Sequence, residues 1–191
     1  MKAILKKRIA LIIAVIVVIA AVPAVAFTAG RTIAAEAAEM TVKEVTAAKG
    51  ESVDIPVSVA HNPGIIGFEL KVSYPDGFTL TDVKKGSLIT ETEKNAVLET
   101  QAILISNPDG SNGYSLIGYV GEDNATGDGE LFILSFDVGE NASAGKAEIK
   151  IEAGTGAEGD GGLYQVNSEN TDVADIVELK SAAVTANVTV K

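Results

Sequence analysis

The sequence predicts an all-β protein, an antiparallel β-sandwich or jelly roll of about nine or ten strands. Apolar and polar residues alternate with a period of two over segments such as 53–59, 68–74 and 132–138, which gives each strand one buried and one exposed face. Turn-forming residues separate these segments, and no regular succession of strand and helix is present. Two sheets packed face to face are the simplest way to bury so many one-sided strands.

The expected strands follow one another with a turn signal between most of them. Gly, Pro and Asn cluster at 62–64, 75–77, 108–110, 112–113 and 127–129, where a positive φ or a preset proline turn reverses the chain. Only 90–99 is expected to form a short helix. The remaining expected strands are 41–45, 78–83, 102–106, 115–120, 147–151, 163–166 and 184–190.

The N-terminal residues 1–26 resemble a secretory signal peptide and are not expected to join the fold. Four basic residues precede the apolar run 9–22, and a small-x-small cleavage pattern follows it. We therefore expect an extracellular or cell-surface protein, with a membrane contact only if this segment stays uncleaved. Residues 27–39 are an Ala-rich flexible spacer, and 40–191 form one β-sandwich domain.

The composition excludes several classes of function. The chain has 26 acidic and 15 basic residues and no cysteine. Without a thiol it has no disulfide, no zinc-thiolate site and no cysteine nucleophile. The excess of acid repels phosphate backbones, so nucleic acid is not an expected partner. A hydrophobic fraction of 47% with 21% charged residues is typical of a globular domain.

No motif predicts catalysis, a metal site or a cofactor. The single histidine, His61, lies in a turn and is interpreted as a solvated loop residue. No serine occupies a Gly-x-Ser-x-Gly elbow, which argues against a Ser–His–acid hydrolase. The acidic stretch 122–130 has oxygen ligands that suit Ca²⁺, but its spacing does not match an EF-hand loop. We therefore predict a non-enzymatic chain.

Direct binding of glycan is the alternative hypothesis for such a sandwich. Sugar-binding faces rely on exposed aromatic rings, and this chain has no tryptophan and four tyrosines. Tyr74 continues the apolar face of its strand and is expected in the core, which leaves Tyr114, Tyr119 and Tyr164 for such a face.

The alternation predicts an exposed protein-binding surface on two strands. If Phe68, Leu70 and Val72 point inward, their neighbours Gly67, Glu69 and Lys71 point outward. On the second strand, placing Gly118 and Val120 inward leaves Ile117, Tyr119 and Gly121 exposed together, next to Glu122 and Asp123. An aromatic anchor beside small residues with an acidic rim is typical of a protein interface.

Four segments in this order resemble a cohesin module over residues 40–191. They are 53–57 (VDIPV), 62–74 (NPGIIGFELKVSY), 118–123 (GYVGED) and 127–136 (GDGELFILSF). The resemblance implies a nine-stranded jelly-roll sandwich whose outer face on one sheet docks a dockerin, the small Ca²⁺-loaded helical module of cellulosomal enzymes. Any Ca²⁺ is then expected on the dockerin and not on this chain.

The resemblance also assigns the partner-binding residues. Gly67 and Glu69 occupy the outward positions at which many cohesins carry Asn and Asp, so Gly67 departs from the pattern. Tyr119, Gly121 and Glu122 fall on the second recognition strand, where Glu122 matches an acidic contact. The predicted set is Gly67, Glu69, Lys71, Ile117, Tyr119, Gly121, Glu122 and Asp123.

The function implied is that of a secreted, non-catalytic module. It would dock dockerin-bearing enzymes or scaffold proteins during assembly of a polysaccharide-degrading, cellulosome-like complex. A carbohydrate-binding or cell-surface sandwich that contacts glycan directly is the alternative.

Overall fold

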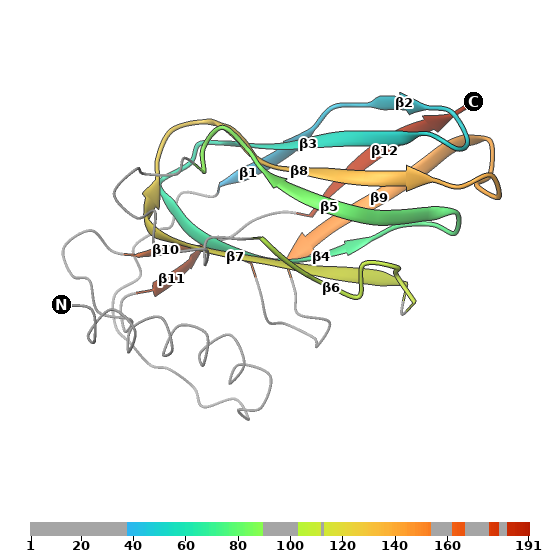
Figure 1. The fold of residues 1–191 in the computed structure, drawn as a ribbon. Coiled ribbons are helices and arrows are strands. Elements are labelled where there is room, and N and C mark those ends of the chain that lie inside the picture. The colour runs from blue at the N-terminus through green and yellow to red at the C-terminus, as the bar shows by residue number, and fades with distance from the viewer. Residues whose placement is uncertain (1–37, 90–102, 112, 154–161, 167–175, 180–182) are drawn as a thin grey trace.

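Two β-sheets lie face to face in the computed structural model, which describes residues 38–89, 103–111, 113–153, 162–166, 176–179 and 183–191 (Figure 1). The smaller sheet has four antiparallel strands in the order β1-β3-β8-β5. Their bounds are β1 Glu39–Val42, β3 Ser52–Ala60, β8 Gly129–Val138 and β5 Phe78–Lys85.

The larger sheet has eight strands, with β4 at its centre. One edge of β4 pairs with β7, which in turn pairs with β6, and the other edge pairs with β9 and β10. All of its pairs are antiparallel except that of β12 with β2. The bounds are β2 Val45–Ala47, β4 Ile65–Ser73, β6 Leu104–Ser106, β7 Tyr114–Ala125, β9 Gly145–Ala153, β10 Gly162–Val166, β11 Ile176–Leu179 and β12 Val184–Val190.

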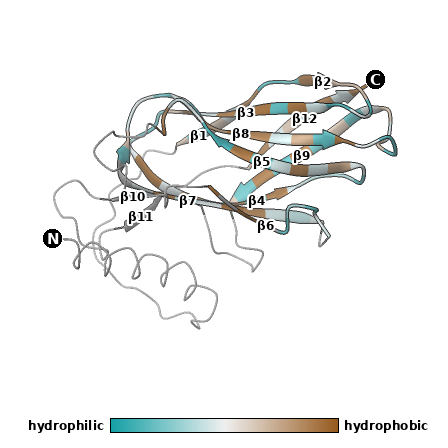
Figure 2. Ribbon diagram, viewed as in Figure 1, coloured by the Kyte–Doolittle hydropathy of each residue, from teal (hydrophilic) through white to brown (hydrophobic). Residues whose placement is uncertain are grey.

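The core is the layer of side chains between the sheets, and it confirms the predicted all-β sandwich. Hydrophobic and hydrophilic residues alternate along the strands (Figure 2). Leu70, Val72, Ile149 and Ile151 of the larger sheet are fully buried against Phe132 and its neighbours on β8. Burial of one face of every long strand supplies the main driving force for folding.

Two details of the strand prediction are wrong. The segment 41–45 was expected to be one strand, but β1 ends at Val42 and β2 begins at Val45, and the two join different sheets. The chain crosses between the layers at Lys43 and Glu44, which period-two alternation does not show. Strand β11 was not expected at all. In the described ranges no helix is long and apolar enough to cross a membrane.

Several predictions lie outside the described residues. These are the signal peptide 1–26, nearly all of the spacer 27–39 and the helix expected at 90–99. At the start of the described chain, Ala38 is already 1% exposed and Met40 is 5% exposed.

The turn after β3 is fixed to the turn after β7. The Asn62 side-chain amide donates hydrogen bonds to the carbonyl oxygens of Ala125 (2.9 Å) and Gly127 (2.8 Å). The Asn62 backbone N–H donates to Asp128 Oδ1 at 3.1 Å, so this carboxylate of the acidic stretch has a structural partner. The exposed His61, with a φ of 53°, begins this turn, as predicted for a solvated loop residue.

The start of β7 is fixed by a second polar cluster. Tyr74 packs edge-on against Phe136, with ring centroids 5.1 Å apart, which confirms its place at the core. Its hydroxyl donates to the Pro108 carbonyl (2.7 Å) and lies 2.7 Å from the fully buried Ser115 hydroxyl. Ser115 in turn donates to the Asn107 carbonyl at 2.6 Å. This cluster satisfies the buried hydroxyl that would otherwise destabilise the sheet.

The outer face of the smaller sheet carries a compact charge pair. Lys84 Nζ lies 2.8 Å from Asp54 Oδ2, and the Ser135 hydroxyl donates to Asp54 Oδ1 at 2.6 Å. The hydrogen bonds from Lys84 and Ser135 hold the pKa of the Asp54 carboxyl below its usual value. Both charges here are therefore compensated within the sheet.

This lowered pKa predicts an acid-dependent loss of stability. Asp54 contributes stability above about pH 4, where an unfolded Asp is ionised, and the contribution is lost as the pH falls through the lower folded-state pKa. We expect Asp54→Asn to lower the free energy of unfolding at pH 7. In this variant the free energy of unfolding should also fall less steeply with decreasing pH below about pH 4. Urea unfolding at a series of pH values measures both, and an unchanged slope in Asp54→Asn would contradict the assignment.

Candidate functional site

Strand β4 carries the predicted recognition residues Glu69 and Lys71 and lies between β7 on one edge and β9 and β10 on the other. Phe68, Leu70 and Val72 are buried, at 2% exposed or less, and Glu69 and Lys71 lie on the opposite, outer face. The predicted orientation of β4 is therefore confirmed for Glu69 and Lys71. Because β4 is paired on both edges, its outer side chains form the middle of a continuous surface.

The predicted orientation of β7 is wrong by one residue. Ile117 is 1% exposed and Tyr119 is 8% exposed, so both belong to the core and neither is available to a partner. The Tyr119 ring lies 5.6 Å from the Phe68 ring, centroid to centroid, on the inner side of the sheet. The residues on the outer face are Leu116, Gly118 and Val120, each of them half-buried.

The reason for the error lies in the composition of β7. Both of its faces are apolar, so alternation alone does not choose between Ile117 with Tyr119 and Leu116 with Val120. Burying Ile117 and Tyr119 removes more apolar surface from water than burying Leu116 and Val120 would. It also keeps Gly118, which has no side chain, out of the core, where it would leave a gap. Pairing with β4 provides the missing signal, since it places Tyr119 opposite Phe68 and Ile117 opposite Leu70.

One further predicted site residue differs from expectation. Gly67 was expected to lie exposed on the outer face as part of the partner-binding set, but it is buried. A Cβ built at Gly67 would lie 2.5 Å from the Tyr119 carbonyl oxygen, next to an irregularity in the β4–β7 register. Glycine is therefore required at 67 by the approach of β7. Gly121 is half-buried, and the side chains of Glu122 and Asp123 lie outside the described residues.

The outward residues define one surface, which we call the β4–β7 face: Glu69, Lys71, Leu116, Gly118 and Val120. Register places Lys71 opposite Leu116 and Glu69 opposite Gly118. The β7 half is apolar and the β4 half is charged. At Gly118 a Cβ would meet nothing closer than the Phe68 carbonyl oxygen at 3.8 Å, so the centre of the face is open.

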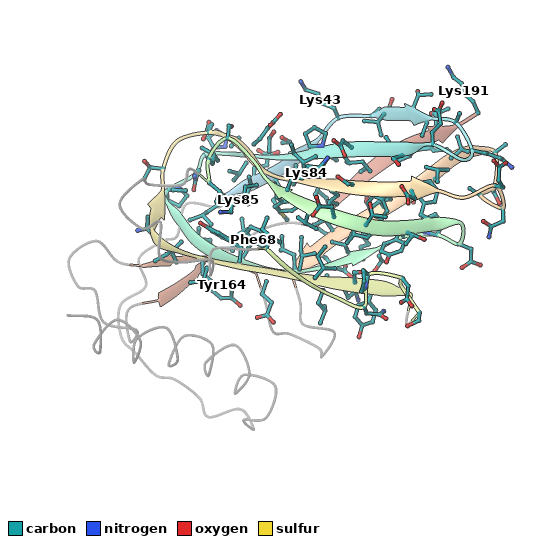
Figure 3. All side chains as sticks on the ribbon, in the orientation of Figure 1. Lys43, Phe68, Lys84, Lys85, Tyr164 and Lys191 are labelled. Carbon is teal, nitrogen blue, oxygen red and sulfur yellow. The ribbon has the colours of Figure 1, made fainter. Side chains whose placement is uncertain are left out.

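Strands β9 and β10 extend this face. Glu152 of β9 stands opposite Lys71, and Tyr164 of β10 stands opposite Gly67. Figure 3 shows Phe68 between the two sheets and Tyr164 on the outer side of the larger one. Sequence reasoning missed Glu152, because nothing local indicates that β9 lies beside β4.

A charged cluster occupies the middle of the extended face. Lys71 Nζ lies 3.0 Å from Glu152 Oε1 and 5.4 Å from the centre of the Tyr114 ring. Lys150 also pairs with Glu152. The hydrogen bonds from Lys150 and Lys71 hold the pKa of the Glu152 carboxyl below its usual value, so this group stays ionised at neutral pH.

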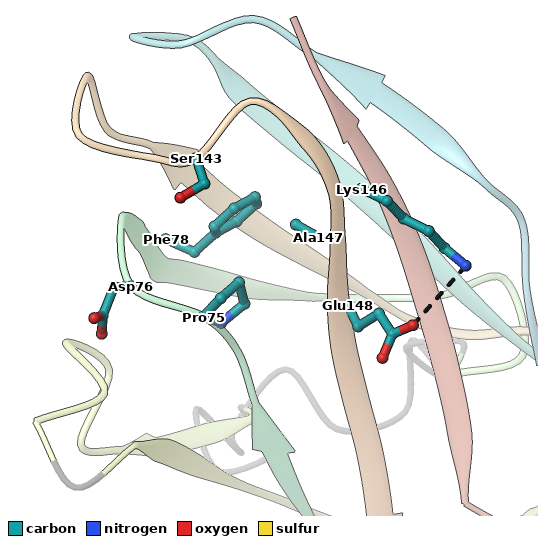
Figure 4. Close-up of a pocket in the computed structure, with 7 residues that line it drawn as sticks. All are labelled: Pro75, Asp76, Phe78, Ser143, Lys146, Ala147 and Glu148. Carbon is teal, nitrogen blue, oxygen red and sulfur yellow. Dashed lines mark ion pairs between the residues drawn. The ribbon is translucent and has the colours of Figure 1, made fainter.

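Other parts of the described chain offer no comparable site. Within it, no group of three His, Cys, Asp or Glu side chains is placed to hold a metal ion. An open depression lies between the turn after β4 and the turn before β9 (Figure 4). Its charged groups include Lys146 and Glu148, 3.9 Å apart and both mostly exposed. The residues lining it are Pro75, Asp76, Phe78, Ser143, Lys146, Ala147 and Glu148.

Comparison with known proteins identifies the class to which this sandwich belongs. The family model described as "Cohesin domain" matches residues 38–177. The chain therefore belongs to the cohesin domain family, whose members are non-catalytic modules. A search of curated proteins found no match.

Solved structures show the same jelly-roll β-sandwich. The cohesin of the type I complex Coh-OlpA–Doc918 from Clostridium thermocellum is 18% identical, with a TM-score of 0.59 over 82% of this chain and 100% of that one. CaCohA2 from Clostridium acetobutylicum is 20% identical, with a TM-score of 0.58 over 82% and 92%. A non-cellulosomal cohesin from the archaeon Archaeoglobus fulgidus is 15% identical, with a TM-score of 0.57 over 81% and 91%.

The two glycines of the site predict opposite effects of the same substitution. Gly67→Ala should lower the free energy of unfolding by about 1–3 kcal/mol, because its methyl group collides with the Tyr119 carbonyl. Gly118→Ala should change it by less than about 1 kcal/mol, in the stabilising direction, because the site is open and the unfolded chain loses freedom. Urea unfolding of both variants measures the difference, and equal effects would contradict this register.

Proposed function

We propose that this cohesin module binds dockerin-bearing proteins through the β4–β7 face. The observation that carries the proposal is the arrangement of that face, with half-buried Leu116 and Val120 on β7 beside the ion pair of Lys71 and Glu152. Apolar residues next to polar and charged ones are the usual composition of a protein interface. Family membership gives the class of partner, since cohesins of known structure include dockerin complexes.

The shape of the β4–β7 face suits a partner whose own binding surface is flat. Gly118 and the buried Gly162 flank Glu69 on either side, so no side chain stands beside this carboxylate on the outer face at those two positions. The hydrogen-bonded sheet holds the backbone beneath these side chains in place, which reduces the entropy lost on binding. Rigid elements position such contacts better than loops do.

The cellular role follows from the same proposal. The signal-like segment 1–26 indicates export, so we infer an extracellular or cell-surface module that attaches dockerin-bearing enzymes or scaffold proteins to a polysaccharide-degrading complex. Any Ca²⁺ requirement is then expected to come from the dockerin.

Calorimetric titration with a panel of dockerins from the same organism tests this function. We expect one-to-one binding by one class of dockerin, abolished by EDTA. Leu116→Ala should weaken it by about 1–2 kcal/mol, because truncation removes apolar contact area in the interface. Ile133→Ala is the matched control, since Ile133 is a half-buried aliphatic residue on the outer face of the other sheet.

The outcomes separate the two functional hypotheses. Equal losses in Leu116→Ala and Ile133→Ala would contradict the choice of face. No binding across the whole panel would contradict the dockerin proposal and favour direct binding of glycan. A pull-down on insoluble polysaccharide would then be the next experiment.

A further inference from the structure

The outer face of the larger sheet changes in composition at β7. From 146 to 152, the outward residues of β9 are all charged: Lys146, Glu148, Lys150 and Glu152. Those of β12 are polar: Thr185, Asn187 and Thr189. From 114 to 120, β7 instead presents a row with no charged residue: Tyr114, Leu116, Gly118 and Val120. Neighbouring apolar side chains that stay half-exposed are typical of a surface that binds a partner.

Tyr114 has the largest side chain of this row and lies at its start. Its ring packs against Lys71, whose Nζ lies 5.4 Å from the ring centre. Leu116 is two residues further along the same face, and two residues of a strand span about 7 Å. A tyrosine ring supplies a large contact area and has few rotatable bonds, so it loses little entropy on binding. A partner that covers Leu116 therefore also reaches the Tyr114 ring.

The turn between β6 and β7 holds the backbone at Tyr114. The Asn107 side-chain amide donates a hydrogen bond to the Tyr114 carbonyl oxygen at 2.7 Å, and the Ser111 hydroxyl donates to Asn107 Oδ1 at 2.6 Å. The next residue, Ser115, is buried and donates to the Asn107 carbonyl oxygen at 2.6 Å. Asn107 has a φ of 55°, which is uncommon for a residue with a side chain, and these hydrogen bonds stabilise it there.

The same turn is attached to the end of β4. Tyr74, the residue after β4, donates a hydrogen bond from its hydroxyl to the Pro108 carbonyl oxygen at 2.7 Å. Gly110 lies against the Tyr74 ring, since a Cβ built at Gly110 would lie 2.7 Å from Tyr74 Cε2. The backbone that carries Tyr114 is therefore fixed before a partner arrives, which lowers the entropy lost on binding.

We propose that Tyr114 is the aromatic anchor of the dockerin-binding surface and that Asn107 is the residue that positions it. The partner contributes an apolar side chain that packs on Leu116 and the Tyr114 ring together, because a buried tyrosine next to an aliphatic residue is a common centre of binding energy. This inference rests on the proposed function and extends the β4–β7 face to the start of β7.

The first test uses a dockerin that binds the purified protein in the titration. Tyr114→Ala should weaken binding by about tenfold or more, whereas Tyr114→Phe keeps the ring and should bind within about threefold of the unaltered protein. Ile133→Ala, on the outer face of the other sheet, is the control and should bind like the unaltered protein. Urea unfolding verifies that each variant is folded. Binding by Tyr114→Ala within about threefold of the unaltered protein would overturn the inference.

A fluorescence experiment tests the contact without relying on a loss of affinity. The chain has no tryptophan, so Tyr114→Trp introduces a single indole at the proposed anchor. The dockerin used has any tryptophan of its own replaced by phenylalanine. Binding should move the indole emission to shorter wavelength and protect it from acrylamide, whereas Ile133→Trp should show neither change. A complex of Tyr114→Trp with unchanged emission and quenching would overturn the inference, even if Tyr114→Ala fails to fold.

A double-mutant cycle tests the positioning role of Asn107. Asn107→Gly removes the amide that holds the Tyr114 carbonyl, while glycine adopts the φ of 55° without strain. It should weaken binding about fivefold in the otherwise unaltered protein and leave the affinity of Tyr114→Ala unchanged, because the two residues act together. An equal loss in both backgrounds, or no loss in either, would show that Asn107 does not act through Tyr114.

The results distinguish this inference from the proposed function. If the unaltered protein and Tyr114→Ala bind a dockerin equally well, the inference is overturned while dockerin binding stands. If no dockerin binds the unaltered protein or Ile133→Ala, the proposed function itself fails. Retention on insoluble polysaccharide that Tyr114→Ala abolishes, without binding of any dockerin, would assign the tyrosine to glycan and overturn both.

Discussion

The antiparallel pairing of β4 with β7 determines which side chains are core and which are surface on the larger sheet. On the inner side it joins Phe68 to Tyr119, and on the outer side it joins Lys71 to Leu116. Because side chains alternate with a period of two, a shift of one residue would exchange the two sets. Gly67 permits this pairing, since a side chain at that position would collide with the Tyr119 carbonyl oxygen of β7.

The two outer faces of the sandwich differ in how their charges are compensated. On the smaller sheet, Asp54 is matched by Lys84, and the pair leaves no excess charge. On the larger sheet, Glu152 is divided between Lys71 and Lys150, and an apolar strand lies alongside. The larger sheet therefore carries an ion-pair cluster and half-buried aliphatic side chains next to each other on its outer face.

The alternation of apolar and polar residues along the sequence predicted most of the strands. Of the β4–β7 face, it predicted the β4 residues but not the β7 residues. Strand β3 alternates between apolar and polar residues over most of its length, so its buried face could be read directly. The buried face of β4 could also be read from its alternation, which places Lys71 on the outer face. Strand β7 has apolar residues on both faces, so its orientation depended on its pairing with β4. The part played by Glu152 depended on β9 lying beside β4, and contacts between residues so distant in sequence leave no trace in local periodicity.

The orientation of β7 is the central claim, and single-cysteine labelling tests it most directly. The chain has no cysteine, so Leu116→Cys, Ile117→Cys, Gly118→Cys and Tyr119→Cys each introduce one thiol. The labelling rate with a water-soluble maleimide is measured for the native protein and in urea. In the native protein, positions 116 and 118 should react much faster than positions 117 and 119, which should be strongly protected relative to their rates in urea. The reverse pattern would show that Ile117 and Tyr119 form the exposed face and would contradict this account of the site.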